Sequence, residues 1–408
     1  MKKTLMALAV GAAFVAPAAF ADVTISGAIN MGIAYVDSDD GDAGVGNTVT
    51  GANVASSGGS NFQLTQNYSN VTISSVDDLG GGLKLDFAFQ VVAPLVNATN
   101  SDTSQGADVI NRNSHIGLVS ESWGGVWYGT NENLYERYYY TIDPLDGAAG
   151  IGGNLQMLGT PGYGVVFDQG HAECGPASGC AGFYRRTDQT IWYDSPSFGG
   201  FTFGAYTTTT AFKGFGPGGT NPTVWGAGVK WVGSGMPLQA WAAYEKHSDL
   251  FGINVIAGSV GTGSDDDGIQ LGLGYTLGDI FIFGNYEMLT YEADGVAAGG
   301  VNNYERDAFS IGVKWNLASG YIGAQYINAL EADCELSGGG TCNSDDSDAQ
   351  MIGVGYYHTM SKQTQAYVMG TWVDNGDNAS YVLAGAGTNN ASPGADHLAV
   401  TIGLKHSF

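Results

Sequence analysis

The sequence predicts an all-β fold in which about sixteen antiparallel strands close into a transmembrane barrel, and three observations support this. Apolar residues alternate with small or polar ones along many segments of about ten residues, as in strands with two unlike faces. Short and long connections alternate between these segments. The composition also fits a lipid-facing surface, because Gly makes up 65 of 408 residues and charged residues only 13%, about half the usual ~25%.

The start of the chain predicts a cleaved export signal at residues 1–21. Residues 1–3 are a short basic start, residues 4–16 are mostly apolar, and residues 19–21 read Ala-Phe-Ala, a typical cleavage site. The apolar stretch is shorter than the roughly 20 residues of a spanning helix. We therefore expect an exported chain whose residues 22–408 form the barrel domain.

The first segment after this signal, residues 23–35, shows the clearest alternation of an apolar and a polar face. The pattern recurs at residues 83–91, 225–231, 269–277 and 309–317. A strand that crosses a membrane in a barrel needs about ten such residues. The alternation therefore predicts strands with one lipid-facing side and one lumen-facing side.

The last segment of the chain repeats the pattern. Counting back from Phe408 in steps of two gives an apolar face that only His406 interrupts. The interleaved residues are small, polar or charged. The alternation alone predicts a two-faced strand that ends on an aromatic residue.

The connections fall into two classes of length. The sequence indicates seven short connections, at residues 78–82, 122–125, 197–200, 234–237, 277–279, 318–320 and 361–363. Eight long polar ones lie between them, at residues 37–59, 93–111, 131–184, 208–222, 247–267, 292–306, 330–348 and 374–395. Fifteen connections join sixteen strands, and short turns at one end with long loops at the other are typical of outer-membrane barrels.

Three internal segments extend this picture to a family. Residues 77–84 (DDLGGGLK), residues 115–129 and residues 186–201, with Arg, then Tyr-Asp-Ser-Pro, then Phe-Gly-Gly, occur in this order between the signal and the terminal Phe408. Together they resemble the Gram-negative trimeric porins, in particular the general porins of the β-proteobacterial type. The match spans nearly all of the chain after the signal.

This resemblance implies a homotrimer of 16-stranded barrels, each spanning the Gram-negative outer membrane many times. It implies a third loop that folds inward to narrow a water-filled pore for small hydrophilic solutes and ions. It also implies contact with outer-membrane lipid and lipopolysaccharide. In this family the barrel-assembly machinery reads the terminal strand, so Phe408 is expected to be an assembly signal.

Loop three corresponds to residues 131–184, too long for a plain connection. By the resemblance, its acids face basic residues of the pore wall, and we expect a constriction formed by Asp143, Asp146, Asp168, Arg112, Arg185 and Arg186. For the three arginines, an ion pair that anchors the loop is the alternative.

The basic wall is thinner here than the resemblance implies. Residues 69–71 read Ser-Asn-Val and residues 129–131 read Gly-Thr-Asn, where related porins often carry an Arg. Because the loops are rich in Asp, we expect a modest preference for cations.

The four cysteines lie in two local pairs. Cys174 and Cys180 belong to loop three, and Cys334 and Cys342 belong to the seventh long loop. Export to an oxidising compartment permits disulfides. Proximity favours the pairs 174–180 and 334–342 over the other two connectivities, and neither pair has a nearby His in metal-ligand spacing.

Acidic runs occur at residues 37–42, 265–267 and 345–348. The first approximates the oxygen spacing of a calcium loop but lacks its distal Glu. No cofactor and no specific metal site are therefore expected, and loosely bound calcium at the acidic loops is the alternative.

Composition and motifs also limit the function. The formal net charge of −25 excludes a nucleic-acid partner, since phosphate contacts require Lys and Arg. The chain has neither a Gly-x-Ser-x-Gly motif nor a phosphate-binding Walker loop, so no enzyme is predicted. The remaining alternatives are a barrel that acts as a surface adhesin or receptor and, less favoured, an outer-membrane lipase or protease.

Overall fold

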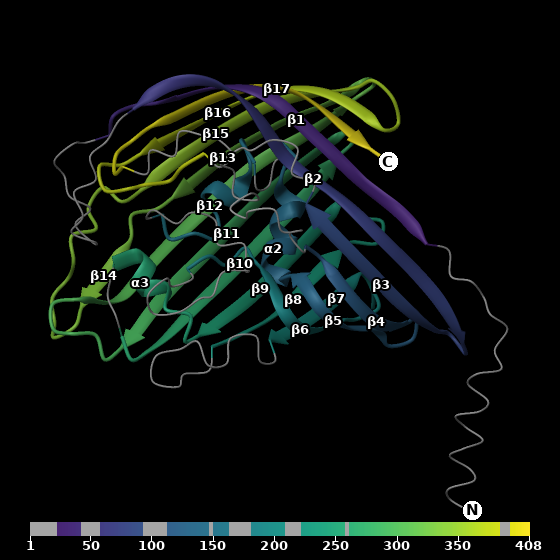
Figure 1. Ribbon diagram of the computed structural model, residues 1–408, viewed down its shortest axis with the longest axis horizontal. Coiled ribbons are helices and arrows are strands. Elements are labelled where there is room, and N and C mark those ends of the chain that lie inside the picture. Colours follow the sequence, from purple (N-terminus) through teal and green to yellow (C-terminus); the bar gives the residue numbers. More distant parts are fainter. Residues whose placement is uncertain are drawn as a thin grey trace, which may run out of the picture.

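The computed structural model describes residues 23–41, 58–92, 112–146, 150–162, 181–208, 222–257, 261–383 and 392–408. Over these residues, seventeen strands form one antiparallel sheet in which the first strand pairs with both the second and the last. The sheet is therefore closed into a barrel of tilted strands (Figure 1). The predicted signal at residues 1–21 lies outside the described residues and stays a prediction.

Within the described residues, four short helices accompany the strands. The strands are β1 (Thr24–Ser38), β2 (Gly59–Gly80), β3 (Leu83–Val92), β4 (Ser114–Ser120), β5 (Gly124–Glu132), β6 (Arg186–Asp194), β7 (Phe201–Thr208), β8 (Thr223–Val232), β9 (Leu238–Ser248), β10 (Gly263–Leu277), β11 (Ile280–Asp294), β12 (Val301–Leu317), β13 (Gly320–Ala329), β14 (Asp333–Leu336), β15 (Ala349–Thr359), β16 (Thr364–Asn375) and β17 (His397–Ser407). The helices are α2 (Leu134–Tyr139), the 3-10 turns η1 (Tyr140–Ile142) and η2 (Asn154–Gln156), and α3 (Gly252–Ala257).

Sixteen of the seventeen strands form the barrel wall, which confirms the predicted fold. The remaining strand, β14, has four residues and pairs with the end of β12 beside the wall. It lies in a segment that the sequence predicted to be only a loop. Four residues are too few for an alternation to stand out from the polar segment around them.

Several strands are longer than the predicted length of about ten residues. β2 has 22 residues and β12 has 17, and the connection between β11 and β12 shrinks to residues 295–300 instead of the predicted 292–306. The ladder continues past the apolar belt, where outward positions such as Glu292 and Glu305 are exposed and polar. The sequence prediction therefore ended these strands too early, because it assigned their polar outward residues to loops.

The outward face of the wall is apolar and the inward face is polar or small. Leu273 and Ile311 are 59% and 53% exposed on the outside, whereas the inward Gln270 and Glu287 are fully buried. A continuous apolar exterior of this kind needs lipid around it. No helix among the residues described in the structure is long and apolar enough to cross a membrane.

Glycines on the inner wall make room for aromatic rings. A Cβ atom at Gly125 would lie 2.0 Å from the ring of Trp127, and one at Gly403 would lie 2.3 Å from the ring of Tyr367. The ring of Trp127 therefore lies over its own strand, β5, and the ring of Tyr367 in β16 lies over the neighbouring strand β17. This arrangement explains part of the high glycine content, and it gives the inner wall a smooth aromatic surface.

Loop three packs on this surface, inside the ring of strands. Figure 1 shows α2 within the barrel. Tyr135, Tyr139, Ile142, Leu145 and Leu155 of loop three are at most 1% exposed and belong to one apolar core with the inner wall. The expectation of an inward-folded third loop is confirmed.

The last residue closes the barrel and gives a first prediction. The amide of Gly27 donates to the carbonyl of Phe408 at 3.0 Å, and the amide of Phe408 donates to the carbonyl of Gly27 at 3.1 Å. Deleting Phe408 removes both bonds at the β1–β17 seam. We expect lower levels of folded protein in the outer membrane but an unchanged single-channel conductance of the channels that form.

Quantitative membrane fractionation and planar-bilayer recording measure these two effects, and Phe408→Tyr, which keeps the ring and the backbone, is the matched control. Normal membrane levels after deletion of Phe408 would remove the case for an assembly signal.

Candidate functional site

A buried ion pair on the inner wall holds loop three in place. Arg306 of β12 donates from Nη1 to Oε1 of Glu287 in β11 at 2.5 Å, and both side chains are 0% exposed. A charge pair without water is stable only where hydrogen bonds satisfy its remaining polar atoms. Loop three supplies most of these bonds, so we call Glu287 and Arg306 the loop-three anchor.

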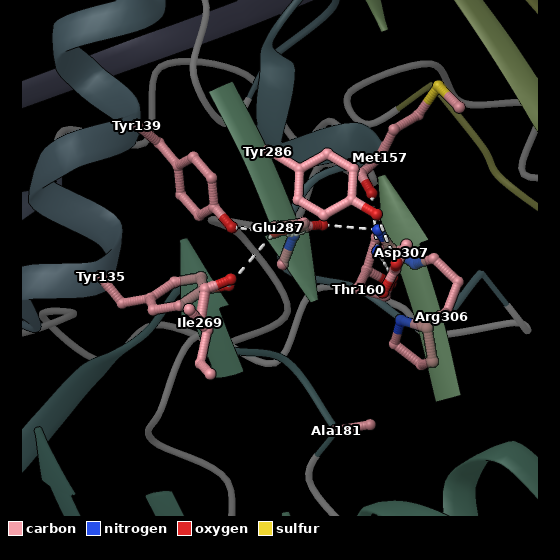
Figure 2. A network of polar contacts seen from close by, with 12 residues as sticks. Tyr135, Tyr139, Met157, Thr160, Ala181, Ile269, Tyr286, Glu287, Arg306 and Asp307 are labelled. Carbon is pink, nitrogen blue, oxygen red and sulfur yellow. Dashed lines mark hydrogen bonds and ion pairs between the residues drawn. The ribbon is translucent and has the colours of Figure 1, made fainter. Parts of the chain in front are cut away.

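Glu287 binds two separate parts of loop three. The hydroxyls of Tyr135 and Tyr139 in α2 donate to Oε2 of Glu287, and the amide of Gly159 donates to both carboxylate oxygens at 3.0 Å. Figure 2 shows the carboxylate between the two phenols on one side and Arg306 on the other. One carboxylate therefore joins two segments of loop three, α2 and the segment around Gly159, to the wall.

Arg306 binds the second of these segments, residues 157–160, through backbone carbonyls. Its Nη2 donates to the carbonyl of Met157 at 3.0 Å and to that of Thr160. A guanidinium presents several donors in a fixed plane, so one side chain can bind Glu287 and two carbonyls together. The anchor thus fixes the path of residues 157–160 as well as that of α2.

Other wall residues hold the loop-three backbone in the same manner. Gln325 of β13 donates to the carbonyl of Gly152 at 2.7 Å, Tyr304 of β12 to that of Pro161 at 2.8 Å, and Tyr291 of β11 to that of Ala181 at 2.6 Å. Tyr357 of β15 donates to the carbonyl of Leu145. Loop three therefore lies against strands β11 to β15 along much of its described length.

The two ends of loop three, at Asn133 and at Arg185, are hydrogen-bonded to each other and to β9. The amide of Asn133 donates to the carbonyl of Arg185 at 3.1 Å, and Thr187 Oγ1 donates to Asn133 Oδ1 at 2.9 Å. Asn133 Nδ2 donates at 3.0 Å to Glu245 of β9, which also accepts from Tyr206 and lies 2.6 Å from Nε2 of His247. The entry and exit of the loop are thereby fixed at one buried polar point.

A second buried cluster lies at the first turn of α2. Nη2 of Arg186 is 2.6 Å from Oε1 of Glu132 and 3.4 Å from Oε1 of Glu136, and Tyr140 donates to Glu136 at 2.6 Å. Burial raises the pKa of Glu136 to about 7, against the effect of Arg186 and with the added repulsion of Glu132. Glu136 therefore exchanges its proton near neutral pH.

The predicted constriction residues fall into two groups. Arg112, Arg185 and Arg186 are 1%, 1% and 3% exposed and lie at the buried roots of loop three. For Arg186 this is the geometry of a loop-anchoring ion pair. Which of the three faces the constriction stays a prediction.

Two predicted acids of loop three, Asp143 and Asp146, are more exposed than these arginines. Asp146 is 39% exposed and bonds to Lys405 of β17, and Asp143 is partly buried and accepts from the amide of Leu145 at 3.2 Å. Asp168 lies outside the described residues. The negative charge of Asp146 is therefore balanced directly by a lysine of the wall.

Other partly exposed charges line the inner wall near the short connections. Arg137 of α2 is paired with Asp194 at 3.0 Å, and Lys230 of β8 lies 3.4 Å from the hydroxyl of Thr141. Neither Lys230 nor Lys314 of β12 has a carboxylate within 4.0 Å among the residues that the structure describes. Two lysines of the wall are thus not neutralised by a neighbouring acid.

The cysteine pairs and the acidic runs are the remaining features predicted from the sequence. Cys334 of β14 forms a disulfide with Cys342, with Cα atoms 5.6 Å apart, whereas Cys174 and Cys180 lie outside the described residues. Within the described part of the chain, no group of three His, Cys, Asp or Glu side chains is arranged to hold a metal ion. Loosely bound calcium at the acidic runs is not tested by this geometry.

A closed barrel with an inward, anchored third loop is the architecture expected of a channel, and comparison with known proteins decides the family. The family profile described as "Gram-negative porin" matches residues 7–378. The chain belongs to the Gram-negative porins. It is therefore an outer-membrane protein that crosses the bilayer many times, as predicted.

Two relatives match this porin over nearly its whole length. It is 27% identical to an outer membrane porin protein of Bordetella pertussis, over 92% of this chain and 95% of the relative. It is 26% identical to outer membrane porin protein 32 of Delftia acidovorans, over 100% of both chains.

Solved structures support the fold. An anion-selective porin from Comamonas acidovorans superposes with a TM-score of 0.66 at 20% identity, over 95% of this porin and 100% of that chain. The trimer form of OmpT, an outer membrane protein of Vibrio cholerae, gives a TM-score of 0.57 at 13% identity, over 95% and 99%.

The anchor was not among the residues predicted from the sequence. Arg306 lay in a segment predicted as a loop, and its partners in loop three are about 146 to 149 residues away in the chain. One signal was available: Glu287 occupies an inward position of an alternating strand, where a charge must face the lumen or a partner.

The anchor gives a second prediction. Replacing Glu287 with Gln leaves Arg306 buried without a counter-charge, which costs on the order of 3–5 kcal/mol. We expect loop three to leave the wall in a larger fraction of molecules, so that single channels become noisier and conduct more. Planar-bilayer recordings measure both effects.

Glu305→Gln is the matched control for Glu287→Gln, because Glu305 lies on the exposed outer side of the adjacent strand. Barrel closure in both variants is checked by the heat-modifiable mobility of the unboiled protein. Identical current traces for the two variants would show that the anchor does not hold the loop.

Glu136 gives a third prediction. Its pKa lies above the ordinary value of 4.5 while α2 is packed, so packing favours the protonated acid. The contribution to packing is complete below pH 4.5 and is lost as pH rises through about 7. We expect loop three to fluctuate more at pH 8 than at pH 5, which appears as added current noise.

The charges that face Glu136 are Arg186, Arg112 and Glu132. Glu136→Gln imitates the protonated acid and should give the quiet trace at both pH values. A variant that keeps the full pH response would assign the effect to another group.

Proposed function

We propose that this porin is a passive diffusion channel for small hydrophilic solutes and ions. The observation that carries the proposal is a closed barrel with an apolar exterior, whose polar interior is narrowed by a loop bound to the inner wall. Such an interior allows solutes to pass without a conformational cycle. No step of bond making or breaking is part of this function.

Whether the channel prefers anions or cations depends on which charged side chains near loop three have no neighbouring opposite charge. The sequence favoured cations because of Asp143 and Asp146, but Asp146 bonds to Lys405. Among the residues that the structure describes, Lys230 and Lys314 have no carboxylate within 4.0 Å. The expected preference for cations therefore finds no support. We propose a weak preference for anions, and the similar porin from Comamonas acidovorans is described as anion-selective.

The acidic outer loops oppose this preference at low salt. Their effect should fade as the Debye length falls from about 10 Å at 0.1 M to about 3 Å at 1 M salt. The wall lysines lie within the lumen and act at shorter range. The anion preference should therefore be clearest in concentrated salt.

The partners are proposed from the family. A homotrimer is supported by the trimeric form of the similar OmpT structure. Contacts with outer-membrane lipid and lipopolysaccharide follow from the exposed apolar wall, and use of the barrel-assembly machinery follows from the terminal Phe408 at the seam.

A surface adhesin or receptor is the second candidate. Large outer loops and the disulfide between Cys334 and Cys342 fit a rigid outer surface. A barrel with this role would conduct little, so conductance separates the two candidates.

The fourth prediction tests the channel and its selectivity together. In planar bilayers the protein should form open channels, and under a KCl gradient at high salt the reversal potential should have the anion sign. Replacing Lys230 and Lys314 with Gln should move it toward cations, whereas Asp143→Asn with Asp146→Asn should move it further toward anions.

Lys246→Gln serves as control, because Lys246 on the outer wall is already paired with Asp265 and Asp267. Absence of conductance would overturn the channel itself. An unchanged reversal potential in the double lysine variant would overturn only the assignment of selectivity.

A further inference from the structure

Three neighbouring side chains form an unusual patch on the lumen side of β11, β12 and β13. Lys314 of β12 lies directly opposite Phe281 of β11, and its Nζ is 4.0 Å from the ring centroid of Tyr321 in β13. We call Lys314, Phe281 and Tyr321 the lysine–aromatic patch. Directly opposed side chains share one face of the sheet, with Cβ atoms about 5 Å apart.

The contacts of Tyr321 place the patch inside the barrel, beside loop three. The ring of Tyr321 stacks on that of Tyr357, with centroids 4.5 Å apart. The hydroxyl of Tyr357 in turn bonds to the carbonyl of Leu145 in loop three. The patch therefore borders the narrowed part of the lumen.

The patch carries one positive charge that no adjacent acid cancels. Lys314 is partly exposed and, within the described part of the structure, has no carboxylate within 4.0 Å. The neighbouring inward positions are Gly274, Thr276, Asn316 and Gly323, none of them charged. Asp143 and Asp146 act on Tyr321 from loop three, but Lys405 already balances Asp146.

The ring of Phe281 lies flat on the wall next to this charge. A Cβ atom at Gly274 would be 2.6 Å from the ring, and Phe283 packs beside it with centroids 5.8 Å apart. Phe281 keeps a partly exposed surface, whereas Phe283 is 3% exposed. The lumen thus offers an apolar ring and an ammonium group side by side.

We infer that the lysine–aromatic patch is a binding subsite for small aromatic carboxylates, with the carboxylate at Nζ of Lys314 and the ring against Phe281. An aliphatic carboxylate would use only the charge, and a neutral aromatic solute only the ring. An aromatic contact contributes more than the burial of its apolar area alone, and a hydrogen bond between charged groups adds to this. A solute with both a ring and a carboxylate should therefore bind more tightly than a solute with only one of them. The inference rests on the proposed channel and names one class of its solutes.

The experiment uses benzoate as the probe on the full-length protein in planar bilayers with KCl. Acetate supplies the charge without the ring, and benzyl alcohol supplies the ring without the charge. Benzoate should interrupt the current at a concentration about tenfold lower than acetate, the effect of roughly one aromatic contact. Benzyl alcohol should have no effect in the same range.

Variants separate the two parts of the patch. Lys314→Gln should remove the benzoate effect, and Lys314→Arg should keep it. Phe281→Leu should weaken benzoate until it matches acetate. Lys84→Gln is the matched control, because Lys84 also occupies an inward wall position but lies on β3, seven strands away by the shorter way around the barrel.

Benzoate and acetate acting alike on the unmodified channel would overturn the inference, as would equal responses of Lys314→Gln and Lys84→Gln. These results leave the channel proposal intact, since current still flows. Loss of all current in the unmodified protein would instead overturn the channel proposal.

Discussion

The interior of a bilayer offers no hydrogen-bond partner to a backbone amide or carbonyl, and this constraint shapes the whole porin. Every wall strand must pair on both sides, so β1 must meet β17. Closure then turns alternate side chains inward, away from lipid. The polar and charged residues that anchor loop three are tolerated only because closure has removed them from the membrane.

Within the closed wall, one buried ion pair organises most of the lumen. Glu287 and Arg306 would be costly alone, and their cost is offset by bonds to the phenols of α2 and the backbone near Gly159. Asp146 of the same loop is balanced by Lys405, whereas Lys314 of the wall stays partly exposed. The position of loop three therefore also decides which charges of the lumen are balanced.

Sequence reasoning predicted the wall well because a two-residue alternation is a local property. It predicted the number of wall strands, the short connections and the pairing of Cys334 with Cys342. It missed α2 because a helix of six residues, without a side-chain cap, depends on the wall that it packs against. The ends of β11 and β12 were missed because their outward residues turn polar beyond the apolar belt.

The candidate site was predicted less well, since it depends on distance in space. Loop three was located, and its acid Asp146 does pair with a lysine of the wall, Lys405. The anchor was not found, because Glu287 and Gly159 are separated by 128 residues. A local sequence pattern cannot predict that a carboxylate and an amide so far apart in the chain will form a hydrogen bond.

The long span of these contacts has a consequence for how the protein is built. Loop three lies early in the chain, but it binds Glu287, Arg306, Tyr357 and Lys405, which follow much later. These partners face inward from strands that must first be inserted and joined. Narrowing of the lumen is therefore a late event in biogenesis, and an incomplete barrel has no surface on which its third loop can settle.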